Sequence, residues 1–241
     1  MNSVDWAGLK LPGMRMVQQR FESAPAADVL DEIDREWSRI HTGLDLPPGS
    51  QIAIGVGSRG ISNLSVVVQA VVIRLKEAGY DPFVTPAMGS HGGATAEGQM
   101  DVLRHRGITE ESVGAPVKAT MDVTPMGEVN GIPLFLDRLA YEADGIVLIN
   151  RIKPHTNFIG PTESGIIKMM AIGLATRWAP NTIIAFRWFD PNMRSSAPPA
   201  RRCWKNARYC SGYACLKIRT MKRHRSKWPG AMKWSVLKVN S

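Results

Sequence analysis

Short apolar stretches alternate along this chain with segments of helical periodicity, and this alternation restricts the possible fold more than any other feature. Strands that alternate with helices predict an α/β fold, a mostly parallel sheet with flanking helices. The predicted strands are Gln51–Val56, Pro82–Met88, Ala119–Val123, Ile132–Phe135 and Gly145–Ile149, and the predicted helices are Ala26–Ile40, Asn63–Ala78, Thr95–His105, Asp137–Glu142 and Ser164–Leu174.

Polar, glycine-rich loops follow three of the predicted strands. Ser58 and Arg59 follow the first, His91 follows the second, and His155 and Lys168 come after the last. The carboxyl ends of parallel strands meet at one edge of a sheet, where α/β proteins bind their ligands. We therefore expect these side chains, which are distant in sequence, to converge on one site.

The composition of the chain changes abruptly after Leu174. Residues 175–241 contain 15 Lys and Arg but a single acid, Asp190, whereas residues 1–174 contain 15 basic and 20 acidic residues. All three cysteines and five of the seven tryptophans also lie in this tail. The chain therefore divides into a domain at 1–174 and a basic tail at 175–241. Its net charge of +9 averages two unlike parts, so it does not by itself indicate nucleic-acid binding.

Residues 1–174 are enough for one domain with a single core, and they contain no cysteine that would suggest disulfides. The segment Met1–Asp5 does not resemble the start of a signal peptide. No apolar run approaches the roughly 18 residues of a membrane span. We expect a cytoplasmic protein that binds neither a membrane nor a nucleic acid.

Two histidines in loops are candidates for acid/base chemistry. His91 stands between Ser90 and two glycines, which is poorly suited to a packed core, and His155 follows Pro154. An imidazole can give or take a proton near neutral pH, so two histidines on opposite sides of one carbon can act as a racemase pair. The alternative for each is a surface histidine, or one that bonds a backbone carbonyl.

Three cationic side chains are candidates for holding a ligand. Lys168 follows Ser164-Gly165 in a helix that is apolar almost all round, so its amine needs a partner or serves as a nucleophile. The alternative is a solvated lysine on a helix surface. Arg59 and Lys153 could each bind a phosphate or carboxylate, or could simply be exposed.

Four short motifs occur in a fixed order along the first 174 residues. They are G-S-R-G-I-S-N at 57–63, A-M-G-S-H-G-G-A-T-A-E-G-Q at 87–99, N-R-I-K-P-H-T at 150–156 and S-G-I-I-K at 164–168. Together they resemble the amino-terminal domain of the lactate racemase family, the enzymes that use a nickel-pincer nucleotide. The resemblance covers about residues 10–174 and is strongest to the branch with Gly-Ser-His-Gly-Gly.

This resemblance implies a racemase or epimerase that acts on a small 2-hydroxy acid. The implied cofactor is the nickel-pincer nucleotide, held covalently by the lysine of S-G-x-x-K. The residues on which the family's roles fall are Lys168 with Ser164 and Gly165 for the cofactor, His91 and His155 for the acid/base pair, and Arg59 for the substrate.

The chain departs from the family pattern at two points. The family often has an acid three residues before the arginine, where this chain has Val56. The family also supplies a further histidine as a nickel ligand beyond the lysine helix, followed by a second domain. Neither is recognisable here, so no metal ligand is assigned.

The tail has the composition of coding DNA translated out of phase. Read from the third base of each codon, residues 175–185 can encode D-P-V-G-A-E-H-Y-H-R-L, which is balanced in charge and places histidines soon after the lysine helix. We therefore expect a frameshift near Leu174 and an irregular tail. The alternatives are a non-catalytic protein with a basic arm that binds nucleic acid or membrane, through Lys222–Lys227 and neighbouring tryptophans, and a zinc site. The cysteine spacing matches no standard zinc motif.

Overall fold

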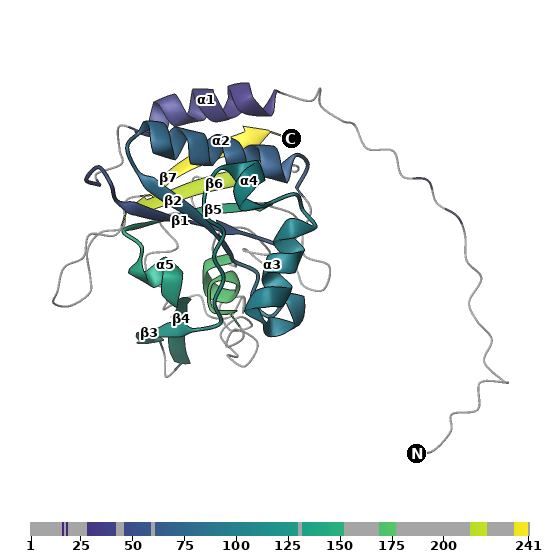
Figure 1. The fold of residues 1–241 in the computed structure, drawn as a ribbon, viewed down its shortest axis with the longest axis vertical. Coiled ribbons are helices and arrows are strands. Elements are labelled where there is room, and N and C mark those ends of the chain that lie inside the picture. The colour runs from purple at the N-terminus through teal and green to yellow at the C-terminus, as the bar shows by residue number, and fades with distance from the viewer. Residues whose placement is uncertain are drawn as a thin grey trace, which may run out of the picture.

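A computed structural model describes residues 16, 18, 28–41, 46–58, 61–129, 132–151, 169–176, 213–220 and 234–240. In it a β-sheet lies between two layers (Figure 1). The helices α1 (Val29–Ile40) and α2 (Leu64–Glu77) cover one face of the sheet. The short helix α5 (Arg138–Glu142) and the π-helix η3 (Met169–Gly173) lie on the other face. The predicted α/β class is confirmed.

Three parallel strands form one side of this sheet. β1 (Gln51–Val56) pairs with β2 (Asp81–Pro86) on one side and with β5 (Gly145–Arg151) on the other. Their carboxyl ends therefore lie at the same edge, and α2 makes the crossover from β1 to β2. The sequence predicted a strand at each of these three places, and the prediction is confirmed.

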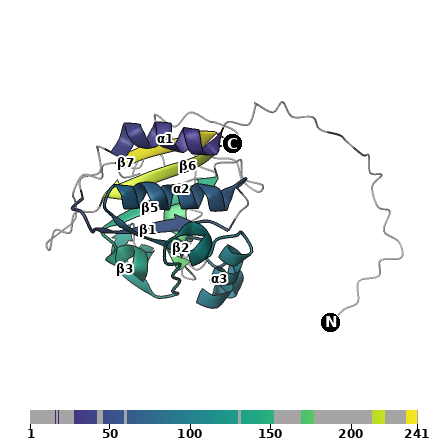
Figure 2. The ribbon, with the colours of Figure 1, turned by 45° about the horizontal axis from the view of Figure 1, so that its top comes forward.

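Beyond β5 the sheet continues with two antiparallel strands from the tail. β6 (Tyr213–Thr220) pairs with β5, and β7 (Trp234–Asn240) pairs with β6. The helix α1 lies against both α2 and β7 (Figure 2). The expectation of an irregular tail is therefore wrong for these two stretches. The reason is that an uncovered β5 offers unpaired N–H and C=O groups, to which segments rich in aromatic and β-branched residues readily pair.

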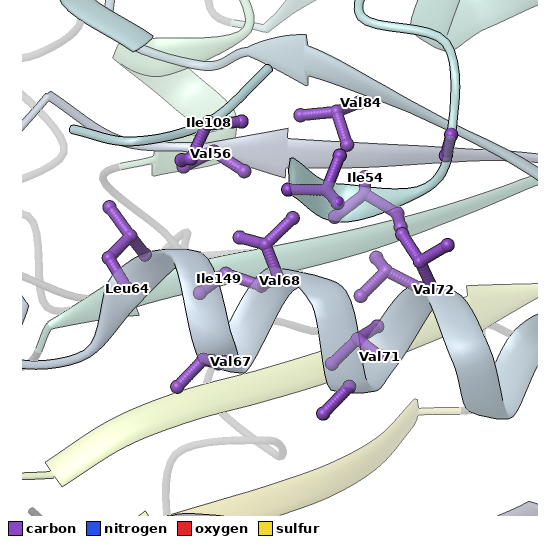
Figure 3. Packing of buried hydrophobic residues seen from close by; sticks show 14 of the residues in the cluster. Ile54, Val56, Leu64, Val67, Val68, Val71, Val72, Val84, Ile108 and Ile149 are labelled. Carbon is purple, nitrogen blue, oxygen red and sulfur yellow. The ribbon is translucent and has the colours of Figure 1, made fainter. Parts of the chain in front are cut away.

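Buried side chains form two clusters, one on each face of the sheet. Successive residues of a strand point to opposite faces, so Ile54 faces α2 while its neighbour Ala53 faces α5. Strands buried on both faces are apolar throughout, which is why these stretches stand out in the sequence. Figure 3 shows the cluster under α2, with Ile54, Val56, Leu64, Val67, Val68, Val71, Val72, Val84, Ile108 and Ile149. The opposite cluster includes Phe83, Ala87, Ile146, Leu148, Met169 and Leu174.

Short polar side chains cap the first turns of two helices. Asp28 accepts a hydrogen bond from the Leu30 N–H (2.8 Å) at the start of α1. Thr95 accepts one from the Gly98 N–H (3.0 Å) at the start of α3 (Ala96–Arg104). Each bond satisfies a backbone donor that the helix itself leaves unpaired, so the caps fix where these helices begin.

Between α3 and β5 the structure confirms the strand predicted at Ile132–Phe135 and the helix predicted at Asp137–Glu142, but it differs in the segment before them. A short helix, α4 (Glu110–Val113), follows α3, and residues 116–118 pair with Val84 at the edge of β2. The strand predicted at Ala119–Val123 is therefore misplaced, because the pairing lies just before it. Next come β3 (Val123–Val129) and β4 (Ile132–Asp137), which form an antiparallel pair outside the main sheet.

Candidate functional site

The loops after β1 and β2 meet at the carboxyl edge of the parallel strands. The Ser58 hydroxyl is hydrogen-bonded to Nδ1 of His91, although the two residues are 33 positions apart. His91 is exposed to solvent. The convergence that the sequence predicted for these two loops is therefore present, and it brings a histidine ring to the edge where α/β folds hold their ligands.

The loop that carries His91 depends on left-handed backbone conformations. Gly89, Gly92 and Gly93 have φ values of +63°, +65° and +68°. Such values are costly for residues with a side chain and are readily adopted by glycine. The His91 N–H donates to the Met88 carbonyl (3.2 Å), and its own carbonyl accepts from the Ala94 N–H (3.3 Å).

The same loop packs directly on the backbone of α3. A Cβ atom added at Gly98 would lie 1.9 Å from the carbonyl oxygen of Gly92, and one added at Gly92 would lie 2.6 Å from the carbonyl carbon of Gly98. Neither position has room for a side chain unless the backbone moves. These contacts give a physical reason for the two outer glycines of the stretch G-G-A-T-A-E-G.

Gln99 stabilises the loop that carries His91 through hydrogen bonds, and the sequence had given no role to this residue. Its side chain is buried, with 2% of the residue exposed. The amide Nε2 donates to the carbonyls of Gly89 (2.7 Å) and His91 (3.1 Å). A buried polar side chain requires such partners, so Gln99 and the loop hold each other in place. The only signal in the sequence was a polar residue at a core-facing position of a helix.

The segment that follows Lys168 lies against the same loops. A Cβ atom at Gly57 would lie 3.3 Å from Cε of Met169. The Gly89 N–H donates to the carbonyl of Gly173 (3.0 Å), and a Cβ atom at Gly173 would lie 2.5 Å from the carbonyl oxygen of Ala87. The chain therefore resumes after Lys168 in close contact with the strand ends that carry Ser58 and His91.

Six other predicted residues lie outside the described part of the chain. The structure therefore does not place them relative to His91. They are Arg59, Lys153, His155, Ser164, Gly165 and Lys168.

Asp137 is a buried acid near this region that sequence reasoning did not select. It begins α5, where its carboxylate accepts a hydrogen bond from the Ala140 N–H (3.0 Å), and 1% of the residue is exposed. Burial raises the pKa of Asp137 from 3.8 to about 6, because the charged form loses its hydration. The Asp137 N–H donates to the Leu174 carbonyl (2.6 Å), which ties α5 to the segment after η3.

Metal-binding and membrane-spanning features are not seen in the described ranges. No group of three or more His, Cys, Asp or Glu there could hold a metal ion. None of the helices described is long and apolar enough to cross a membrane.

Comparison with known proteins gave no match to a family model, to a curated protein or to a solved structure.

Proposed function

We propose that residues 1–174 are the amino-terminal domain of a racemase or epimerase of a small 2-hydroxy acid, of the lactate racemase type. The observation that supports this most is the contact of Ser58 with His91 at the carboxyl edge of the sheet. The segment that continues from Lys168 packs beside that contact, through Met169 and Gly57. The imidazole of His91 and the segment that follows Lys168 thus lie at the same edge of the sheet.

In this proposal the protein's own groups bind the substrate and move its proton. Arg59 binds the substrate carboxylate, as guanidinium groups commonly do. His91 and His155 would stand on opposite sides of C2; one of them takes the hydroxyl proton of one enantiomer, and the other gives a proton back to the same oxygen as the opposite enantiomer forms. Lys168, with Ser164 and Gly165 beside it, would hold the nickel-pincer nucleotide. When bound, that cofactor would supply a reversible acceptor for the C2 hydride, which returns to either face of the ketoacid.

We also propose that the tail is the product of a frameshift near Leu174 and that the enzymatic activity of this chain is impaired. In this reading frame no nickel ligand of the family pattern is recognisable beyond Lys168. Catalytic residues that act as a unit fail together when one is lost. Resequencing the DNA around codon 174 should show an open, in-phase continuation, whereas early stop codons in the other phase would contradict the frameshift.

The catalytic proposal is tested with a protein restored to the other phase after codon 174. This protein is loaded with the nickel cofactor and assayed for racemisation of a panel of chiral 2-hydroxy acids. Activity should be lost in Lys168→Ala, and His91→Gln should reduce it by at least about 100-fold, the usual contribution of a general acid or base. Activity that survives Lys168→Ala unchanged, or equal activity in the unrepaired chain, would show the assignment to be wrong.

The alternative, a non-catalytic protein with a basic arm, gains support from the tail strands. β6 and β7 continue the main sheet, so these parts of the tail are regular structure rather than the irregular segment expected of a frameshift. Under this alternative the full chain binds DNA with a steep dependence on salt. Replacing the four Lys and Arg residues of Lys222–Lys227 with Gln would then weaken DNA binding and reduce its dependence on salt. Binding that is weak and unchanged by these replacements argues against the arm.

A further inference from the structure

The hydrogen bond between Ser58 and His91 joins two loops and involves a particular ring nitrogen, Nδ1. We infer that Ser58 is a positioning residue for His91: its hydroxyl oxygen accepts a hydrogen bond from Nδ1–H and so makes Nε2 the nitrogen that exchanges protons. The assignment of Ser58 stands on this geometry. That the exchanged proton belongs to a substrate rests on the proposed function.

The backbone of His91 is fixed on both sides by hydrogen bonds, so the orientation of its ring depends on its side-chain contacts. Its N–H is bound to the Met88 carbonyl, and its carbonyl accepts from Ala94 and from the buried amide of Gln99. With the backbone held, the side-chain torsions are the remaining freedom of the residue. A hydrogen bond to Nδ1 restricts those torsions, because it is satisfied in only one ring orientation.

Ser58 is itself held, so it can act as a fixed partner. It follows the buried end of β1 at Val56, and its backbone carbonyl accepts a hydrogen bond from Nη2 of Arg106 (3.3 Å). A Cβ atom added at the adjacent Gly57 would lie 3.3 Å from Cε of Met169. The hydroxyl is therefore presented to the ring from a strand end rather than from a free loop.

The chemistry of the ring explains why the Nδ1 partner matters. A neutral imidazole carries its proton on one nitrogen only, and the other is the base. For Nε2 to accept a proton, the neutral ring must carry hydrogen on Nδ1, and a partner that accepts from Nδ1–H favours that form. A serine oxygen does so without adding a charge. It also keeps the same bond when the ring becomes a cation, since Nδ1–H is present in both states.

The test is nitrogen NMR of the full chain labelled with ¹⁵N-histidine, recorded at about pH 9, well above the ordinary histidine pKa of about 6.5. His91→Gln identifies the His91 signals. We expect a neutral ring with hydrogen on Nδ1. In Ser58→Ala the ratio of this tautomer to the Nε2–H tautomer should fall about fivefold, the change that one neutral hydrogen bond supports. Ser58→Thr, which keeps a hydroxyl, should restore the ratio.

The matched control is Ser90→Ala. Ser90 is an exposed serine next to His91, with no side-chain hydrogen bond in the part of the chain that the structure describes. Its removal should leave the tautomer ratio unchanged. A neutral His91 with hydrogen on Nε2, or a ratio that Ser58→Ala does not alter, overturns the inference. These outcomes are independent of the racemase assay, so a failure of the proposed activity and a failure of the Ser58 assignment are separate results.

Discussion

Removing the charge of Asp137 should make the protein more stable. Burial raises the pKa of this carboxyl from 3.8 to about 6, so the folded protein holds the proton more tightly than the unfolded chain does. Ionised Asp137 therefore lowers the free energy of unfolding. The penalty is complete above about pH 6, declines as the pH falls towards 3.8, and is absent below that.

The size of the penalty follows from the same pKa values. A rise from 3.8 to about 6 corresponds to about 3 kcal/mol at pH 7.5. Asp137→Asn keeps a side-chain oxygen for the Ala140 N–H and carries no charge, and asparagine is as good a helix cap as aspartate. We expect it to raise the free energy of unfolding at pH 7.5 by about 1–3 kcal/mol, the lower values applying if the new amide finds no partner.

Urea unfolding of the full chain, followed by circular dichroism at pH 7.5 and pH 4.5, measures this effect. The advantage of Asp137→Asn should be large at pH 7.5 and should shrink at pH 4.5, where the native carboxyl is already protonated. Asp137→Ala is the control. It removes the charge together with the helix cap, and loss of the cap should reduce the gain in the free energy of unfolding by about 1 kcal/mol. An Asn variant less stable than the parent at pH 7.5, or an advantage equal at both pH values, would refute the reasoning.

Two further predictions concern the loop of His91. Gly98→Ala should destabilise the protein by on the order of 3 kcal/mol despite the better helix propensity of alanine, because the new Cβ meets the Gly92 carbonyl. Gly93→Ala, with φ at +68° and nothing within 4 Å, should cost only about 1–2 kcal/mol in the same urea titration; equal losses would contradict the packing. Gln99→Met should cost about 2 kcal/mol and speed hydrogen exchange at the His91 N–H, since two carbonyls lose a donor. The exposed Gln69→Met is its control and should change stability by less than about 0.5 kcal/mol.

The sequence predicts most of the main sheet because that part obeys simple periodicity. β1, β2 and β5 are buried on both faces and are mostly apolar. The helices that begin at Asp28 and Thr95 carry capping side chains that mark their first turns. These signals are local, so they can be read without knowing the tertiary structure.

Of the elements between α3 and β5, α4 and β3 were harder to predict because their signals are short. Thr109 and Ser112 cap α4 reciprocally, but a four-residue helix has almost no periodicity to detect. β3 and β4 flank Asn130-Gly131, a pair typical of tight hairpin turns, which would have indicated the antiparallel pairing. The pairing of β6 with β5 depends on an open strand edge, which no local pattern in the tail reveals.

The location of the candidate site could be predicted from the sequence, but its hydrogen-bond network could not. Loops after consecutive parallel strands must share an edge, which brought Ser58 and His91 together as expected. The role of Gln99 could not be predicted, because its partners are backbone carbonyls whose positions depend on the folded loop. The predicted roles of His155, Lys168 and Arg59 remain predictions.

The pairing of β6 with β5 makes the tail difficult to remove. A chain cut at residue 174 would expose the backbone of Gly145–Arg151 along its whole length, beside a two-faced apolar core. Such an edge is a template on which a second copy of the domain can add its own strand. A shortened domain would then dimerise or aggregate for reasons unrelated to catalysis. In a chain restored to the other phase, a different segment would have to pair with β5. The number of residues between Leu174 and that segment would limit where the rest of the protein can lie beside the sheet.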